Sequence, residues 1–196
     1  MSISIVCWSL STTPVPLNNP DVVILVTNSN VKHELTGSEY PERRAACERA
    51  AGALGIPSLR DASVEMLNAN RNQLDTTTFK RAWHVVTEIQ RTEQAADCLM
   101  NQDYALLGKL MHESHNSLRD NFEVSCTELD QLVELGMACP GVYGSRMTGG
   151  GFGGCTVTLC DKKRVDGIKN HIENHYKQTA TFYVCDAVGG AAPLNM

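Results

Sequence analysis

The stretch of residues 142–159 constrains the fold most strongly, because two strand-like segments flank a glycine-rich run there. The segments 142–147 and 155–159 carry β-branched and aromatic side chains, which favour strands. Between them, the seven residues 148–154 include five glycines. A hairpin turn needs only one or two glycines, and each additional glycine costs conformational entropy on folding. The pattern predicts a β-hairpin whose connection lets another group approach its backbone closely.

Upstream of this hairpin, one strand is followed by a helix. Residues 22–26 form a continuous apolar run, typical of a strand buried on both faces, and the Asn-Ser-Asn sequence at 28–30 predicts its end. After Ser38, apolar residues recur at helical intervals until Gly55 and Pro57 supply a stop signal. This predicts a helix whose apolar stripe consists of Tyr40, Cys47, Ala51 and Leu54.

Helical periodicity recurs in four later segments, at residues 77–100, 104–118, 125–137 and 164–176. We expect the first two of these helices to pair antiparallel. Ser125 followed by Glu128 matches a capping box at the start of the third. The β-branched and aromatic residues of segment 179–184 predict a last strand.

The resulting order of elements predicts an α+β fold. Strand, helices, strand, strand, helix and strand follow one another as in a ferredoxin-like split β-α-β-β-α-β unit, with extra helices in the first crossover. We expect an antiparallel sheet with helices on one face. Residues 1–20 are interpreted as the remnant of a preceding domain and a linker, residues 21–188 as the domain itself, and residues 189–196 as a loose tail.

Composition limits the partners and the compartment. The net charge is −5 with no run of lysine or arginine, so neither nucleic acid nor a membrane surface is expected as a partner. No signal peptide or membrane span is evident. The eight cysteines are scattered without a Cys-x-x-Cys pair, which is typical of reduced residues in a cytosolic protein. We therefore expect a cytoplasmic monomer.

The glycine run has two possible explanations. Successive glycine N–H groups can converge on a phosphate, or the run can pack tightly against another segment. Gly149, Gly151 and Gly154 match the spacing of a dinucleotide-binding fingerprint, but a strand follows them where that fingerprint needs a helix. A Walker loop and the companion motifs of protein kinases are absent from the sequence. Spacing alone leaves both explanations open.

Two pairs of histidines fail as metal sites. His112 and His115 are one residue too close for a His-Glu-x-x-His motif, so a polar helix face is the favoured interpretation. His171 and His175 have the right spacing, but no third ligand is evident nearby, and a solvated helix is again favoured. No metal site is predicted in this chain.

The segment from Gly144 to Val157, GSRMTGGGFGGCTV, resembles the third signature motif of the GHMP kinases in its galactokinase form. Segments 27–41, 112–120 and 123–130 contain further stretches that resemble galactokinase in the same order. The relatives that act on N-acetylgalactosamine tend toward alanine and tryptophan in the glycine run, where this chain has a third glycine and Phe152. The resemblance implies ATP-dependent phosphorylation of galactose to galactose 1-phosphate, with Mg²⁺ accompanying ATP.

The resemblance also implies roles for particular residues. Tyr40 maps onto a tyrosine that contacts the sugar, although the helical pattern alone favours a core position for it. Arg43 and Arg44 are expected on an exposed helix face, and Arg146 is expected to steady the glycine run by bonding backbone carbonyls. The implied phosphate-site loop consists of Thr148, Gly149, Gly150, Gly151, Phe152, Gly153 and Gly154.

The sequence departs from the family in one large respect. Galactokinases carry an N-terminal domain with a sugar-binding first motif and a serine-rich second motif, and no Ser-Ser pair occurs in this chain. The catalytic base and its partner arginine belong to that domain, so no catalytic residue is named here, and we expect the chain alone to be inactive. Two alternatives are a non-catalytic regulatory relative that binds sugar or nucleotide and a kinase acting on N-acetylgalactosamine.

Overall fold

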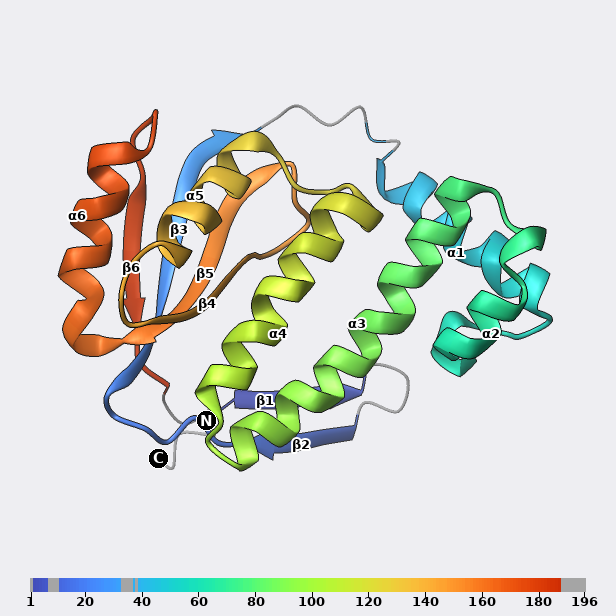
Figure 1. Ribbon diagram of the computed structural model, residues 1–196, viewed down its shortest axis with the longest axis horizontal. Helices are drawn as coiled ribbons and strands as arrows, with labels where there is room; N and C mark the ends of the chain where they lie inside the picture. Colours follow the sequence, from blue (N-terminus) through green and yellow to red (C-terminus); the bar gives the residue numbers. More distant parts are fainter. Residues whose placement is uncertain (1, 7–10, 33–36, 38, 188–196) are drawn as a thin grey trace, which may run out of the picture.

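The computed structural model describes residues 2–6, 11–32, 37 and 39–187, so Ser38 and the tail at 189–196 lie outside the described residues. Figure 1 shows a sheet with helices against it and a row of helices extending away from it. The strands are β1 Ser2–Val6, β2 Ser11–Val15, β3 Val22–Lys32, β4 Val142–Met147, β5 Gly153–Asp161 and β6 Thr181–Cys185. The α-helices are α1 Glu39–Leu54, α2 Val64–Ala69, α3 Thr76–Met100, α4 Tyr104–Ser117, α5 Thr127–Met137 and α6 Val165–His175.

The main sheet has the predicted ferredoxin-like topology. Its strand order is β4-β5-β3-β6, and every neighbouring pair is antiparallel. At the centre, Val26 of β3 lies opposite Val157 of β5 on one side and Tyr183 of β6 on the other. The predicted β-hairpin is confirmed as β4 and β5, and the glycine run connects them.

Helices α5 and α6 cover one face of this sheet (Figure 1). Val23 and Leu25 of β3 are fully buried there, in one core cluster with Ile168 and Ile172 of α6 and Leu132 of α5. The apolar residues of α6 recur at helical spacing, so a single stripe of that helix supplies its contacts with the sheet.

The other face is covered too, because Val22 of β3 and Leu159 of β5 share a second core cluster with Leu107 of α4. The prediction of helices on one face only is therefore wrong, whereas β3 is buried on both faces as expected.

The remaining long helices extend from the β4 edge of the sheet. In Figure 1, α4 lies beside β4, α3 packs against α4, and α1 packs against the far end of α3. Asp75 and Asp103 begin α3 and α4 as N-caps, since their carboxylates accept the amides of Thr78 and Leu106. The antiparallel pairing of these two helices, predicted from the sequence, is confirmed.

Helix α4 and strand β4 approach each other through two glycines. A Cβ on Gly108 would lie 2.0 Å from the carbonyl oxygen of Tyr143, and a Cβ on Gly144 would lie 2.1 Å from that of Gly108. No side chain other than hydrogen fits at either position without moving backbone. We call this contact the glycine crossing, and it lets α4 run close along the edge strand.

The first strand of the main sheet is longer than predicted. Strand β3 continues to Lys32, and Asn28 still pairs with Cys155 of β5. A register irregularity follows between Asn28 and Lys32, and Asn30 takes a left-handed φ of 55°. The Asn-Ser-Asn sequence therefore forms a bulge within the strand, because asparagine tolerates this conformation without ending the ladder.

Three other local predictions need correction. Helix α5 begins at Thr127, and the hydroxyl of Ser125 donates to the carboxylate of Asp130 at 2.5 Å, so the predicted capping box does not form. The short helix α2 was not predicted, nor was the pairing of β1 with β2 in a separate two-stranded sheet. Strand β2 contains Pro14, a residue that usually argues against a strand.

Two further observations concern surface and redox chemistry. No helix among the described residues is long and apolar enough to cross a membrane. The seven cysteines in the described part of the chain are all unpaired. Cys98, Cys139 and Cys160 lie in the core, whereas Cys185 on the outer strand β6 is exposed.

Candidate functional site at the glycine loop

The glycine run forms a closed loop, residues 148–154, that we call the glycine loop. The amide of Thr148 donates to the carbonyl of Cys155 at 3.0 Å and closes the base of the loop. Gly149, Gly151, Gly153 and Gly154 have positive φ angles, and so does Phe152 at 59°. Because L-residues rarely adopt such angles, the loop conformation itself accounts for four of the five glycines.

One side of the glycine loop is docked against the segment that precedes α5. The amide of Phe152 donates to the carbonyl of Val124 at 2.8 Å. A Cβ on Gly151 would lie 2.0 Å from the same carbonyl oxygen, so only glycine fits there. The ring of Phe152 packs beside a buried cluster that includes Val124 and Leu118. At this point the packing explanation of the glycine run is correct.

The other side of the glycine loop is open. Cβ atoms on Gly149, Gly150 or Gly154 would have no neighbour within 4 Å. Gly150 does not have a positive φ either, so neither backbone conformation nor packing requires glycine at that position. An unobstructed backbone at this position is what a ligand approaching the loop needs.

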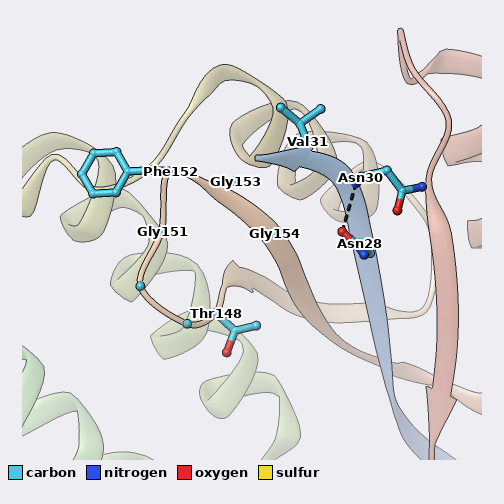
Figure 2. Close-up of a pocket in the computed structure, with 10 residues that line it drawn as sticks. Asn28, Asn30, Val31, Thr148, Gly151, Phe152, Gly153 and Gly154 are labelled. Carbon is cyan, nitrogen blue, oxygen red and sulfur yellow. Dashed lines mark hydrogen bonds between the residues drawn. The ribbon is translucent and has the colours of Figure 1, made fainter. Parts of the chain in front are cut away.

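A cavity of about 480 Å³ lies on the open side, between the glycine loop and the end of β3. Figure 2 shows Asn28, Asn30 and Val31 of β3 across from the loop, with the ring of Phe152 pointing away from them. Asn28 accepts the amide of Asn30 at 3.0 Å, which fixes the bulge at this edge. Among the described residues, no charged side chain lines this cavity, so its polar groups are the amides of Asn28 and Asn30, the hydroxyl of Thr148 and the backbone.

A second cavity, of about 490 Å³, lies on the other side of the same loop and reaches helix α1. Gly149, Gly150 and Phe152 line both cavities, so the glycine loop forms the wall between them. The remaining lining residues combine apolar side chains beneath the loop with polar ones from α1, namely Glu39, Tyr40, Arg43, Arg44, Cys47, Leu118, Phe122 and Val124.

Tyr40 projects from the first turn of α1 at the rim of this second cavity. Its side chain is 76% exposed, so the core position favoured by the helical pattern is wrong. A phenol hydroxyl both donates and accepts hydrogen bonds, which suits a ligand rich in hydroxyl groups. The structure thus brings Tyr40 and the glycine loop to one cavity.

The two neighbouring arginines of α1 differ. Arg44 is exposed as expected and pairs with Glu48 at 2.8 Å. Arg43 was expected to be exposed too, but its guanidinium is largely buried and donates to the carbonyls of Phe122 and Glu123 at 2.7 and 2.8 Å. Its acceptors lie about eighty residues later in the chain, and local periodicity carries no signal for such a contact.

Arg146, next to the glycine loop, behaves as predicted. Its Nε donates to the carbonyl of Met147 at 3.0 Å, and its Nη1 lies 3.2 Å from Glu88 of α3. Burial raises the pKa of Glu88, but the Ser114 hydroxyl and the charges of Arg146 and Arg91 outweigh it and hold that pKa below its usual range. Glu88 is therefore ionised and anchors Arg146 at the foot of the loop.

The histidine pair on α4 is not a polar helix face. His115 is 1% exposed, its Nδ1 accepts the amide of Met147 at 3.3 Å, and its Nε2 lies 3.3 Å from the Asp130 carboxylate. The amide donor assigns the acceptor role to Nδ1, so this histidine ties α4 to the strand that leads into the glycine loop. No group of three or more metal-ligating side chains occurs within the described residues.

Comparison with known proteins agrees with this geometry. The family model described as the C-terminal part of GHMP kinases matches residues 95–178. Galactokinase from Bos taurus is 56% identical over 96% of this chain and 48% of its own length, and galactokinase from Haemophilus influenzae is 46% identical over 94% and 50%. The chain spans about half the length of these curated relatives.

Solved structures give the same result. The crystal structure of Lactococcus lactis galactokinase complexed with galactose matches with a TM-score of 0.87 and 36% identity, over 93% of this chain and 49% of that one. L. major mevalonate kinase in complex with R-mevalonate matches with a TM-score of 0.59 at 18% identity, over 89% and 45%, and supports the fold alone. The chain therefore belongs with the GHMP kinases and corresponds to the C-terminal part of a galactokinase.

Proposed function

We propose that this chain acts as the C-terminal part of an ATP-dependent galactokinase, which converts D-galactose to galactose 1-phosphate in galactose catabolism. The observation that carries the proposal is the position of the glycine loop between two cavities, with Tyr40 at the rim of one of them. The galactose-complexed relative, which matches 93% of this chain, supports the choice of sugar.

In this proposal, the two sides of the glycine loop take different parts of the reactants. The hydroxyl of Tyr40 binds the sugar in the second cavity, and the open backbone at Gly149 and Gly150 faces the transferred phosphate. The loop from Thr148 to Gly154 is then one wall of the phosphate site. Phosphoryl transfer depends chiefly on positioning and charge neutralisation, and a rigid wall supplies positioning.

Other groups must come from the rest of a galactokinase. Neither cavity contains the cluster of carboxylates that would hold Mg²⁺, so the described residues of this chain do not fit that ion, although ATP would bring it. No general base faces the loop from the described residues that line the cavities, other than Glu39 at the rim. We therefore assign the base, its partner arginine and most of the nucleotide contacts to the remaining half.

The domain boundaries remain part of the proposal. The separate two-stranded sheet of β1 and β2 supports the assignment of residues 1–20 to a preceding domain and linker, and the main sheet supports a domain over 21–188. We also propose a cytoplasmic monomer, which agrees with the unpaired cysteines of the described residues.

The test compares this chain alone with the chain fused behind the N-terminal half of the bovine relative. We expect ATP-dependent phosphorylation of galactose by the fusion only. An inactive fusion that is folded would contradict the proposal. Tight binding of galactose or ATP by the lone chain in isothermal titration would favour a regulatory binding module instead, and a preference of the fusion for N-acetylgalactosamine would change the assigned sugar.

A further inference from the structure

A short segment connects the glycine loop to the helix that carries Tyr40. Residues 118–122 form a turn of π-helix that continues α4, and Glu123 leaves it with a left-handed φ of 53°. The next residue, Val124, accepts the amide of Phe152 and is the contact against which Gly151 packs. The position of the docked side of the glycine loop therefore depends on the turn that precedes Val124.

Two arginines hold this turn from opposite helices. Arg43 of α1 donates to the carbonyls of Phe122 and Glu123, and Arg81 of α3 donates to the carbonyl of Asn121 and, at 2.6 Å, to the carboxylate of Glu123. We call Arg43 and Arg81 the arginine clamp. The last carbonyls of a helical turn lack intrahelical partners, and guanidinium groups satisfy several of them in a fixed geometry.

Burial and charge indicate that the contacts of the arginine clamp are a specific feature of the fold. The side chains of Arg81 and Arg43 are 5% and 13% exposed, which is unusual for arginine unless it is paired. Burial and the charge of Arg81 lower the pKa of Arg43, while the carboxylate of Glu123 counteracts this shift. Two cations so close together are tolerated because Glu123 and three carbonyls lie between them.

We propose that Arg43 and Arg81 are positioning residues that set the glycine loop relative to the Tyr40 helix. The link runs from α1 through Arg43 to the turn, and from Val124 to the amide of Phe152. Loss of either guanidinium releases the turn, allows Val124 to shift and loosens the docked side of the loop. The inference rests on the proposed function only for its catalytic consequence, since the structural link concerns this chain alone.

The test replaces each clamp residue with methionine, which keeps length and removes the donors. We expect Arg81→Met and Arg43→Met to raise the hydrogen-exchange rate of the Phe152 amide about tenfold or more, by NMR on this chain. The exchange rates of amides in the sheet core, such as that of Leu25, should change far less. In the active fusion, kcat/KM for galactose should fall about tenfold or more.

Arg49→Met is the matched control, because Arg49 lies on the same helix α1, is exposed, and makes a single bond of 3.3 Å to Thr78. This control variant should leave the exchange rate of the Phe152 amide and the value of kcat/KM for galactose unchanged. If Arg81→Met does not fold, Glu123→Ala tests the same link from the other side. Unchanged exchange at Phe152, or an equal rise throughout the core, would overturn the inference.

Failure of this inference is distinguishable from failure of the proposed function. Exchange of the Phe152 amide is measured without substrate or activity, so it decides the positioning role by itself. An inactive wild-type fusion contradicts the proposed function and leaves the exchange result valid. An active fusion in which both methionine variants retain normal kcat/KM contradicts the catalytic consequence of the clamp and leaves the proposed function intact.

Discussion

The glycine crossing and the glycine loop use the same residue for opposite purposes. At the crossing, Gly108 and Gly144 are buried, and a Cβ on either would strike backbone about 2 Å away. In the loop, Cβ atoms on Gly149, Gly150 and Gly154 would meet nothing within 4 Å. At the crossing, the backbones of α4 and β4 leave no room for a side chain, whereas the loop leaves its own backbone accessible beside a cavity. Glycine at the crossing serves stability, whereas part of the loop serves access.

The largest effect is expected at the crossing. Gly108→Ala should destabilise the chain by about 3 kcal/mol or more, because the new methyl group forces α4 away from β4. Urea unfolding measures this change. Gly52→Ala is the control, since Gly52 lies on α1 with open space around it. The control should gain up to about 1 kcal/mol from helix propensity, and an equal response of both variants would contradict the comparison.

The docked side of the glycine loop should respond next most strongly. Gly151→Ala adds a clash with the Val124 carbonyl to the strain of a φ of 86°, and we expect a loss of about 2–3 kcal/mol. Gly149→Ala has nearly the same φ, 81°, but no neighbour, and should cost only about 1 kcal/mol. The difference between the two unfolding free energies isolates the contact, and its absence would show that the loop is not docked.

A smaller change in stability is expected with pH, through the buried His84 of α3. Burial lowers the pKa of His84 to about 4, and its ring lies 4.6 Å from that of Phe122. The folded state therefore binds this proton less readily than the unfolded state, so stability is complete above pH 6.5 and decreases as the pH falls toward 4.

Unfolding in urea should show a loss of about 1–2 kcal/mol between pH 7 and pH 5. His84→Gln should remove most of this dependence, whereas His175→Gln, at an exposed position of α6, should keep it. His112 contributes in the same direction, since burial lowers its pKa as well. An unchanged pH dependence in the His84 variant would show that this histidine titrates normally.

Tyr40→Phe should affect ligand binding and leave stability almost unchanged. The side chain is 76% exposed, so the unfolding free energy should change by less than about 0.5 kcal/mol. Loss of one hydrogen bond to the sugar should raise KM for galactose about tenfold in the active fusion. Tyr183→Phe is the control, because Tyr183 is also exposed but lies on β6. Equal KM values for both variants would remove Tyr40 from the sugar site.

The elements that the sequence predicts correctly are those with a strong local period. Strand β5 and helix α6 each show their characteristic period within about ten residues, so the sequence predicts both elements. The order of the elements along the chain then predicts their places in the fold. Helix α2 has only six residues, too few to show a period. The bulge at Asn30 was mistaken for a strand end because asparagine signals both features.

The candidate site could be predicted from the sequence only in part, because some of its contacts join residues that are far apart in the chain. The glycine loop and Tyr40 were identified from motif resemblance, and both line the second cavity. Arg43 and Arg81 were not found, since their acceptors at residues 121–123 are remote in sequence. Nor can spacing separate Gly150 from Gly151, because the difference lies in what surrounds each Cβ position.

The most direct test of the central claim is the substitution Gly150→Leu in the active fusion. Gly150 has open space and no positive φ, so the unfolding free energy should change by less than about 0.5 kcal/mol. The side chain would block the wall shared by the two cavities, and kcat/KM should fall about a hundredfold or more. A folded variant with normal activity would contradict the claim that this side of the loop faces the reactants, and an unfolded one would show that Gly150 serves packing.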